Sequence, residues 1–448
     1  MTRKSIFPMG IVLVIFLFFV VGCAVNIKQE RETISSSIEA RVGKSLPPIS
    51  KDQSFQLPED VKMEDGLSEE EAIAIALWNN AQFQADLVRL RLAKADLADA
   101  RMIKNPVLSL LFPVGPKQLE AALNLPIEIL WQRPNRIAFA RLNTDQVTEN
   151  LIQNGLSLVQ DVLTAYADLV LAEQRAEIMK EEAGIQAEIA SIAGSRLRVG
   201  DISEMEATAI RLEALRTEEN SINFINQAKI QNLRLKTLLG MISASEEISL
   251  QPGLLEYEET MPVDELLKLA YAARPDLRAA EIAIEAAGKR LGWERSKIFN
   301  LIGVLDANGQ GKEGFEMGPG MQLEVPLLNW NKGGRTRAAA QMEQATKQYL
   351  ATKDQISGEV QEAYHNYMSA HQILTLLRNK SVPDAQQASE NAEKAYSIGE
   401  ISYLEFLQFQ RQLLDSRLRE AEAAANMQKA GAQLRYSIGF KPMKVEEK

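Results

Sequence analysis

The sequence predicts a mainly α-helical protein with a small β part, built from a helix–β-hairpin–long helix–helix unit that occurs twice. Three observations support this fold class. Ala, Leu, Glu, Gln and Arg are plentiful while aromatic residues make up only 6% of the chain, which favours long helices with narrow apolar seams. The second half repeats landmarks of the first in the same order, and short segments of strict alternation interrupt the helical pattern in each half.

The duplication is visible at an offset of roughly 194 to 200 residues. Its landmarks are matching pairs: Pro126 with Pro326, Trp131 with Trp330, Tyr166 with Tyr364, Gly200 with Gly399, and Gly240 with Gly439. Because so many pairs keep their order, chance similarity is a poor explanation. We place the first repeat at residues 67–257, the second at 262–440, and a C-terminal tail at 441–448.

Each repeat should contain unusually long helices. In the first, we expect one helix over 68–103, opened by the Ser68–Glu71 capping box, then a helix over about 135–198 and another over 203–239. The second repeat should match, with helices near 270, over 331–397 and over 402–437. A helix of about 60 residues is roughly 90 Å long. Helices of this length suit a tube of antiparallel helices better than a globular core.

Two predicted hairpins, at about 106–128 and 299–328, supply four strands of roughly ten residues, the length that crosses a bilayer when tilted. Four strands cannot close a barrel, and an open edge cannot face lipid, so at least two chains are needed. Trp131 and Trp330 fall where strand passes into helix, as expected of membrane-interface aromatics. The alternative is a soluble sheet with a structural Trp at each end.

The N-terminus predicts export and lipidation. Arg3 and Lys4 precede an apolar run, so residues 1–22 are expected to be a signal peptide. The run ends in Val20-Val21-Gly22-Cys23, which resembles the lipobox of bacterial lipoproteins and implies cleavage before Cys23 and diacylation of its sulfur. Ala24 then suggests passage to the outer membrane. An incidental Cys in an ordinary signal peptide or short membrane helix is the alternative. Residues 23–66 are predicted to be an irregular, lipidated leader.

Charge and chemistry exclude several functions. The net charge of −10 argues against nucleic-acid binding, which depends on Lys and Arg. The chain has one Cys and two His, His365 and His371, which lie six residues apart; a metal site is therefore implausible. We find no phosphate-binding Gly loop and no nucleophile elbow. The sequence predicts neither an enzyme nor a cofactor.

Together, the lipobox, the duplicated unit and the Gly-centred turns resemble the TolC-type outer-membrane factor (outer membrane efflux protein) family, lipoprotein branch, over about residues 67–440. The most specific motifs are Arg198-Val199-Gly200 and Tyr396-Ser397-Ile398-Gly399. The resemblance implies a homotrimer with a 12-stranded transmembrane β-barrel and an α-helical tunnel. It also implies a passive channel in the Gram-negative outer membrane, extending into the periplasm and energised by an inner-membrane pump.

The same resemblance implies that the tips at Val199, Gly200, Ile398 and Gly399 dock a periplasmic adaptor protein. Glu206 and Glu405, which follow the tips, are candidates for an acidic ring at the pore entrance. Both also sit three residues after a Ser, so helix capping is an equally good explanation. The family often has Arg where this chain has Ile401, and an acid where it has Gln408, so the family's gating network does not transfer directly.

Two questions stay open at this stage. A lipid-anchored periplasmic adaptor or structural coiled-coil lipoprotein is the alternative function, although an adaptor would show one helical hairpin among many short strands. The transported substrate, whether metal ion, drug or polypeptide, is not specified. Tyr403, Phe406 and Phe409 are expected to pack between helices rather than to bind a drug.

Overall fold

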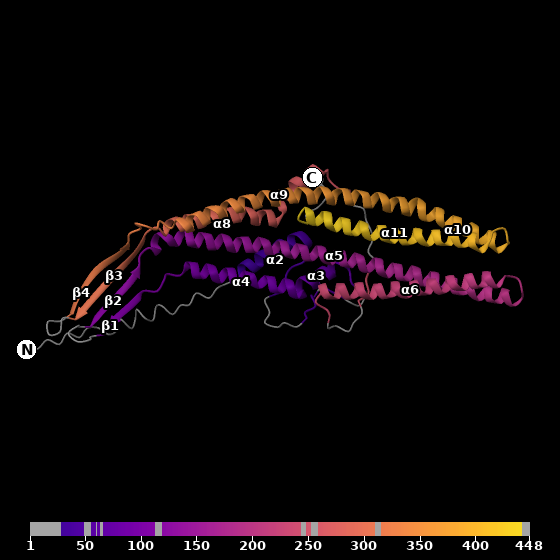
Figure 1. Ribbon diagram of the computed structural model, residues 1–448, viewed down its shortest axis with the longest axis horizontal. Coiled ribbons are helices and arrows are strands. Elements are labelled where there is room, and N and C mark those ends of the chain that lie inside the picture. The colour runs from indigo at the N-terminus through magenta and orange to yellow at the C-terminus, as the bar shows by residue number, and fades with distance from the viewer. Residues whose placement is uncertain are drawn as a thin grey trace, which may run out of the picture.

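The computed structural model describes residues 28–48, 55–59, 61–62, 66–112, 119–242, 248–251, 259–309 and 315–440. Over these residues the chain is a long, gently curved body with a β-sheet at one end and two helical hairpins at the other (Figure 1). The mainly helical fold class and the duplicated unit are confirmed. The predicted signal peptide (1–22), Cys23 and the tail (441–448) lie outside the described residues.

The elements of the two repeats correspond one to one, apart from an interruption in the second long helix. The first repeat contains α3 (Glu69–Asn79), α4 (Ala81–Arg101), β1 (Val107–Leu111), β2 (Glu120–Pro126), α5 (Ile129–Arg198) and α6 (Glu204–Leu238). The second contains α7 (Val263–Ala273), α8 (Pro275–Ser296), β3 (Asn300–Gly309), β4 (Phe315–Glu324), α9 (Lys332–Leu376), η2 (Leu377–Ser381), α10 (Val382–Ser397) and α11 (Tyr403–Ser437).

The predicted single helix over 68–103 is wrong, because the chain bends at Asn80. The backbone of Asn80 is extended, with φ −62° and ψ 115°, and its side-chain oxygen accepts a hydrogen bond from the Phe83 N–H at 2.9 Å. Asn80 therefore ends α3 and caps α4. The Ser68–Glu71 capping box that opens α3 is confirmed.

The second long helix, predicted over 331–397, runs from Lys332 to Ser397 but contains one irregular turn that was not predicted. A five-residue π-helical turn, η2, separates α9 from α10. Pro383, the second residue of α10, has no N–H to donate to the preceding turn. A π turn is one way in which a helix accommodates such a residue without ending.

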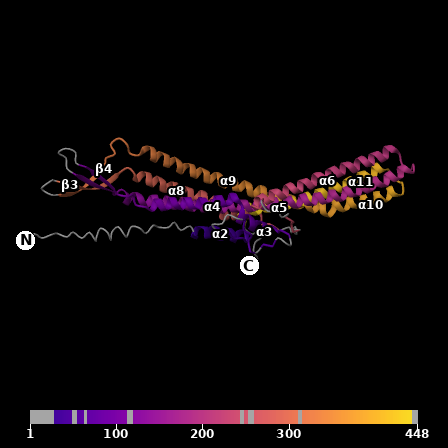
Figure 2. The same ribbon diagram turned by 90° about the horizontal axis from the view of Figure 1, so that it is seen from below.

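The leader was predicted to be irregular over 23–66, and this is wrong for α2 (Lys28–Val42). Ile34 and Ile38, four residues apart, are fully buried by packing against the body. Gly155 of α5 leaves room for Ile38, since a Cβ there would lie 2.7 Å from the Ile38 Cδ1. Figure 2 shows α2 lying alongside α4, outside the layer of long helices.

The middle of the body holds the largest buried clusters, one in each repeat. Tyr166 of α5 is enclosed in the first, and its hydroxyl donates to the carbonyls of Leu67 (2.8 Å) and Gln251 (3.0 Å). Burial is the main cause that raises the pKa of Tyr166 to about 12. An apolar window of α5 is long enough to cross a membrane, but 61% of it is buried within the chain. That window therefore belongs to the protein core.

Each repeat closes when its last helix meets the junction between its two short opening helices. Gly240 follows α6 with φ +69°, and Gly439 follows α11 with φ +75°. A Cβ on Gly240 would overlap the carbonyl oxygen of Asn79, and one on Gly439 would lie 3.2 Å from that of Ala273. Both glycines therefore combine a left-handed backbone with a close approach, which a side chain would prevent at Gly240 and crowd at Gly439.

We predict that Gly240→Ala destabilises the protein more than Gly200→Ala does. Both positions have a positive φ, which costs Ala about 1 kcal/mol. Only Gly240 also has a backbone atom in the space that a Cβ would need, whereas nothing lies within 4 Å at Gly200. Thermal unfolding followed by circular dichroism should show the larger loss for Gly240→Ala. Equal losses would contradict the closure that we describe.

Candidate functional site

The β-sheet at one end of the body has the order β1-β2-β3-β4, with every neighbouring pair antiparallel. Four strands per chain were predicted and are confirmed. The predicted length of about ten residues holds for β3 and β4, whereas β1 has five residues and β2 has seven. Residues 113–118, between β1 and β2, lie outside the described part of the chain.

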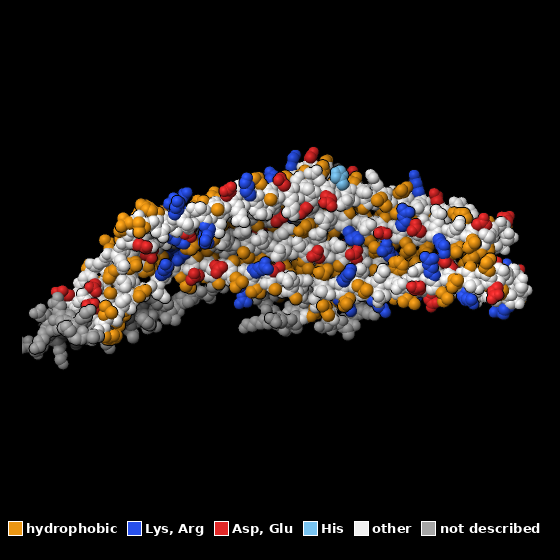
Figure 3. Space-filling model, in the orientation of Figure 1, with side chains coloured by type: hydrophobic (Ala, Val, Ile, Leu, Met, Phe, Trp, Pro, Cys, Tyr) orange, Lys and Arg blue, Asp and Glu red, His pale blue; other side chains and the backbone are white. Residues whose placement is uncertain are grey.

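One face of this sheet is apolar. Residues opposite each other on neighbouring strands point to the same side, and Leu108, Leu123, Leu305 and Pro319 form one such row across all four strands. The other members of this face include Leu110, Ala121, Leu125, Leu301, Gly303, Ala307, Met317, Met321 and Leu323. Many of them are exposed, and hydrophobic side chains gather over the strands in Figure 3. An exposed apolar face of this kind marks contact with a membrane or a partner.

The opposite face carries all the carboxylates of the described strands, although Val107, Leu111, Ile302 and Val304 also lie on it. The carboxylates are Glu120, Asp306, Glu316 and Glu324, and no Lys or Arg occurs in the four strands as described. Asn300 donates to the Glu324 Oε2 at 2.7 Å, and Asn308 donates to the Asp306 Oδ2 at 2.9 Å. These hydrogen bonds hold the carboxylates on one side of the sheet.

Trp131 and Trp330 lie where the sheet meets the helices, as their positions in the sequence suggested. Trp131 is in the first turn of α5 and is 37% exposed; its indole N–H donates to the Ser296 carbonyl at 3.1 Å. Trp330 stands just before α9 and is 53% exposed. Their place at a membrane interface remains a prediction.

The two tips lie at the opposite end of the body (Figure 1). Gly200 has φ +79° and Gly399 has φ +80°, and the N–H of each donates to a carbonyl of the helix that it ends. Each Gly-centred turn therefore has a left-handed glycine that ends the helix before it. Val199 is 80% exposed and Ile398 is 71% exposed, so each tip presents an apolar side chain to its surroundings. Docking of an adaptor there is not tested by this geometry.

Glu206 and Glu405 begin the helices that leave the tips. At Ser402 the capping box is complete: the Glu405 N–H donates to the Ser402 Oγ, and the Glu405 carboxylate accepts from the Ser402 N–H at 2.8 Å. The hydrogen bond from that N–H lowers the pKa of Glu405. At Ser203 the Glu206 N–H donates to the Oγ at 3.1 Å, which is one half of the predicted box. Capping is thus established for Glu405, and pore lining remains a prediction for both.

Aromatic side chains pack between the tips. Tyr403 and Phe406 are buried, and Tyr396 stacks on Phe406 with ring centroids 5.2 Å apart. Ile401, at the position where the resemblance would expect Arg, packs against the same cluster. The expectation of helix packing is confirmed for Tyr403 and Phe406, whereas Phe409 is 40% exposed.

Ion pairs join the two hairpins along their length. Arg411 of α11 contacts Glu213 of α6 at 2.6 Å, and Arg175 of α5 contacts Glu422 of α11 at 3.0 Å. Exposed pairs such as these contribute at most about 1 kcal/mol each. They set how the hairpins lie side by side more than they stabilise the fold.

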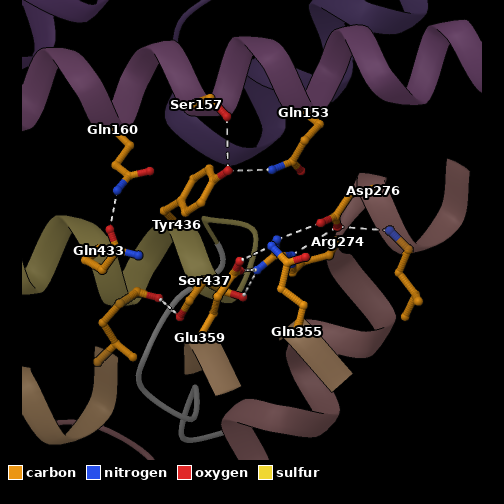
Figure 4. Close-up of polar contacts among 12 residues, drawn as sticks. Gln153, Ser157, Gln160, Arg274, Asp276, Gln355, Glu359, Gln433, Tyr436 and Ser437 are labelled. Carbon is orange, nitrogen blue, oxygen red and sulfur yellow. Dashed lines mark hydrogen bonds and ion pairs between the residues drawn. The ribbon is translucent and has the colours of Figure 1, made fainter. Parts of the chain in front are cut away.

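A buried charge network lies halfway along the body (Figure 4). Arg274, between α7 and α8, is 4% exposed and binds Asp276 and Glu359. It also donates to the Ser437 carbonyl at the end of α11, at 3.4 Å. Burial alone would lower the pKa of Arg274, but its hydrogen bonds and charge contacts with the two carboxylates outweigh burial and raise it.

Tyr436, beside this network, joins the repeats. Its ring lies 5.7 Å from the Arg274 guanidinium, and its hydroxyl oxygen accepts from Gln153 at 2.8 Å and contacts the Ser157 hydroxyl at 3.0 Å. Sequence reasoning missed this site. The available signal was that Arg274 matches Asn80 in the duplication, so both repeats place a polar residue at the same helix junction.

The remaining candidate residues are the two histidines and the single cysteine. His365 is exposed and contacts the Tyr364 ring edge-on. Among the residues that the structure describes, no group of three His, Cys, Asp or Glu could hold a metal ion. Cys23 lies outside the described residues.

Comparisons with known proteins agree on one family. The family model described as "Outer membrane efflux protein" matches residues 72–241 and 266–440. The cobalt-zinc-cadmium resistance protein CzcC of Cupriavidus metallidurans is 25% identical over 363 residues, covering 79% of this chain and 85% of the relative.

Two solved structures share the fold. A membrane protein from Pseudomonas aeruginosa has a TM-score of 0.73 at 17% identity, covering 88% of this chain and 98% of that one. The Campylobacter jejuni CmeC outer membrane channel has a TM-score of 0.72 at 16% identity, covering 88% and 93% of the two chains.

Proposed function

This chain belongs to the outer membrane efflux protein family, and we propose that it is the outer-membrane channel subunit of a tripartite efflux system. The observation that carries the proposal is the four-stranded sheet, apolar on one face and acidic on the other, at one end of a long helical body. Such a sheet suits a barrel wall with lipid outside and water inside. Under this proposal the channel is passive and catalyses no reaction.

The sheet needs partners to close. β1 and β4 are the outer strands of the described sheet, and an open strand edge cannot face lipid. The smallest transmembrane barrels have about eight strands, so one chain is too few. Channels of this family work as trimers, and four strands from each of three copies give twelve. We therefore propose a homotrimer whose long helices form the tunnel below the barrel.

The family also works with a periplasmic adaptor and an inner-membrane pump. We propose that Val199, Gly200, Ile398 and Gly399 contact the adaptor. Two features support this assignment: the tips lie at the end opposite the strands, and each exposes an apolar side chain beside a glycine turn. Trp131 and Trp330 would then mark the periplasmic level of the membrane, with diacylated Cys23 as a separate anchor.

For the cargo we propose cations, with divalent metal ions as the first class to test. The relative CzcC is named for cobalt, zinc and cadmium resistance. The face with the carboxylates supports the same class here. In a trimer, the barrel would contain three copies each of Glu120, Asp306, Glu316 and Glu324, and the described strands carry no Lys or Arg. Rings of carboxylates favour cations in pores. Glu206 and Glu405 would add a second acidic ring near the tips.

The barrel proposal predicts opposite outcomes for two neighbouring residues. Leu123→Arg puts a charge on the apolar face, which costs about 2–4 kcal/mol near the bilayer midplane. Ala122→Arg puts the same charge on the polar face, where water is available. Membrane extraction followed by mass measurement in detergent should give trimers for Ala122→Arg and little trimer for Leu123→Arg. Equal yields, or a monomeric wild-type channel, would refute the barrel.

The docking proposal predicts that Gly399→Trp and Gly200→Trp abolish efflux while trimer yield and membrane insertion stay normal. A bulky side chain would prevent the turn from presenting its backbone to an adaptor. Gly399→Ala is the matched control: its left-handed backbone costs about 1 kcal/mol and nothing lies within 4 Å, so most efflux should remain. Loss of trimers in the Trp variants would show a folding defect and contradict docking.

The cargo proposal predicts weaker cation preference when the strand carboxylates are neutralised by Glu120→Gln, Asp306→Asn, Glu316→Gln and Glu324→Gln together. Reversal potentials across a salt gradient in planar bilayers would measure the change. The pair Glu206→Gln with Glu405→Gln should lower the preference further if those side chains face the pore. If they only cap helices, this pair will lower thermal stability slightly and leave selectivity unchanged. An unchanged reversal potential in the strand variant would reject the cation assignment.

Lipidation predicts that Cys23→Ser removes incorporation of a clickable fatty acid. Cys23 is the only cysteine of the chain, so no other thiol could take its place. Trimers should still form, because the anchor is separate from the barrel. Labelling that persists in Cys23→Ser would show that the lipobox interpretation is wrong.

A further inference from the structure

A cavity of about 330 Å³ lies where the sheet meets the helices. Residues from four segments line it. Three are cationic: Lys104 before β1, Arg136 of α5 and Lys297 after α8. The facing strands carry only carboxylates among their described charged residues. The cavity therefore brings three cations next to strands whose described charged residues are acidic.

The cavity belongs to the acidic side of the sheet. Asn300, one of its lining residues, donates to Glu324 and accepts from the Gln132 side chain at 3.4 Å. Glu324 is opposite Asn300 in the register and lies on the face that carries the carboxylates. A ligand would thus reach the cavity from water and not from lipid.

Two of the cations are held in place by the protein. Arg136 donates its Nε to the Ala100 carbonyl at 3.0 Å and its Nη2 to the Met102 carbonyl at 2.6 Å. The Lys297 ammonium lies 2.7 Å from the Glu294 Oε1 and 4.0 Å from the centre of the Trp293 ring. Lys104 is exposed. Fixed charges bind a ligand with less loss of conformational entropy than mobile ones.

Glu128 supplies a hydrogen-bond acceptor inside the cavity. Its Oε2 is buried and has no hydrogen-bond partner among the described residues. A buried carboxylate oxygen of this kind is rare and accepts a hydrogen bond from any donor that enters the cavity. The cavity therefore combines cations, an acceptor and, in Trp293, an aromatic wall.

We propose that this cavity binds a small organic anion that carries a ring and a hydrogen-bond donor. Its carboxylate would contact Lys104 and Arg136, its ring would lie beside Trp293, whose face Lys297 covers, and its donor would satisfy Glu128. Charge-assisted hydrogen bonds to two cations give affinity, and the buried oxygen selects for the donor. This inference does not depend on the cargo or on conduction, since it concerns binding alone.

The test is calorimetry on the purified full-length protein in detergent at low salt, with 4-hydroxybenzoate as the probe. We expect one site per chain. Benzoate, which lacks the hydroxyl, and 4-hydroxybenzyl alcohol, which lacks the charge, should each bind about tenfold more weakly or not at all. Lys104→Ala should weaken binding of the probe by a similar factor. Lys229→Ala, an exposed lysine of α6, is the matched control and should leave affinity unchanged.

Several results would overturn the proposal. These are no binding to the wild-type protein, equal affinity for benzoate and the probe, or equal losses in Lys104→Ala and Lys229→Ala. Inorganic phosphate that displaces the probe at equal concentration would show an unselective oxyanion site and reject the roles of Trp293 and Glu128. Because binding is measured without transport, failure here leaves the channel proposal standing.

Discussion

The arrangement of both repeats depends on one constraint. The last helix of each repeat, α6 or α11, must pack against the junction between the two short opening helices of that repeat. Asn80 donates to the Leu238 carbonyl at the end of α6, and Arg274 donates to the Ser437 carbonyl at the end of α11. A left-handed glycine follows each helix and brings its backbone against the junction. In each repeat, the two short helices and the last helix therefore lie end to end beside the long helix. The body is for this reason long and narrow and not globular.

The two junctions differ in charge, and this difference links the repeats. Asn80 needs only neutral partners, whereas buried Arg274 requires the carboxylates of Asp276 and Glu359. Removing one partner of a buried ion pair typically costs about 3–5 kcal/mol, because it leaves an uncompensated charge. Tyr436 packs on this guanidinium and reaches Gln153 of the first repeat. The second junction therefore closes its own repeat and also fixes the first repeat beside it.

Sequence reasoning succeeded where the determining contacts are local. The Ser68–Glu71 box, the turns at Gly200 and Gly399 and the period of two in the strands each depend on residues a few positions apart. It missed one local cap, at Asn80, and otherwise failed where a distant partner decides. α2 forms because Ile34 and Ile38 pack against the body, with room provided by Gly155, and nothing within the leader reveals that surface. The cavity around Glu128 likewise joins segments that are far apart in the chain, so only the fold could show it.

The strand register and the helix length together decide where the two ends of the molecule act. A slip of one residue between β2 and β3 would turn Glu120 toward the apolar side, so the alternation holds one register. That register fixes how the sheet passes into α5. The 70 residues of α5 then span about 105 Å at 1.5 Å per residue. The exposed tip at Val199 therefore lies about that far from the strands, at the far end of the periplasmic part of the channel.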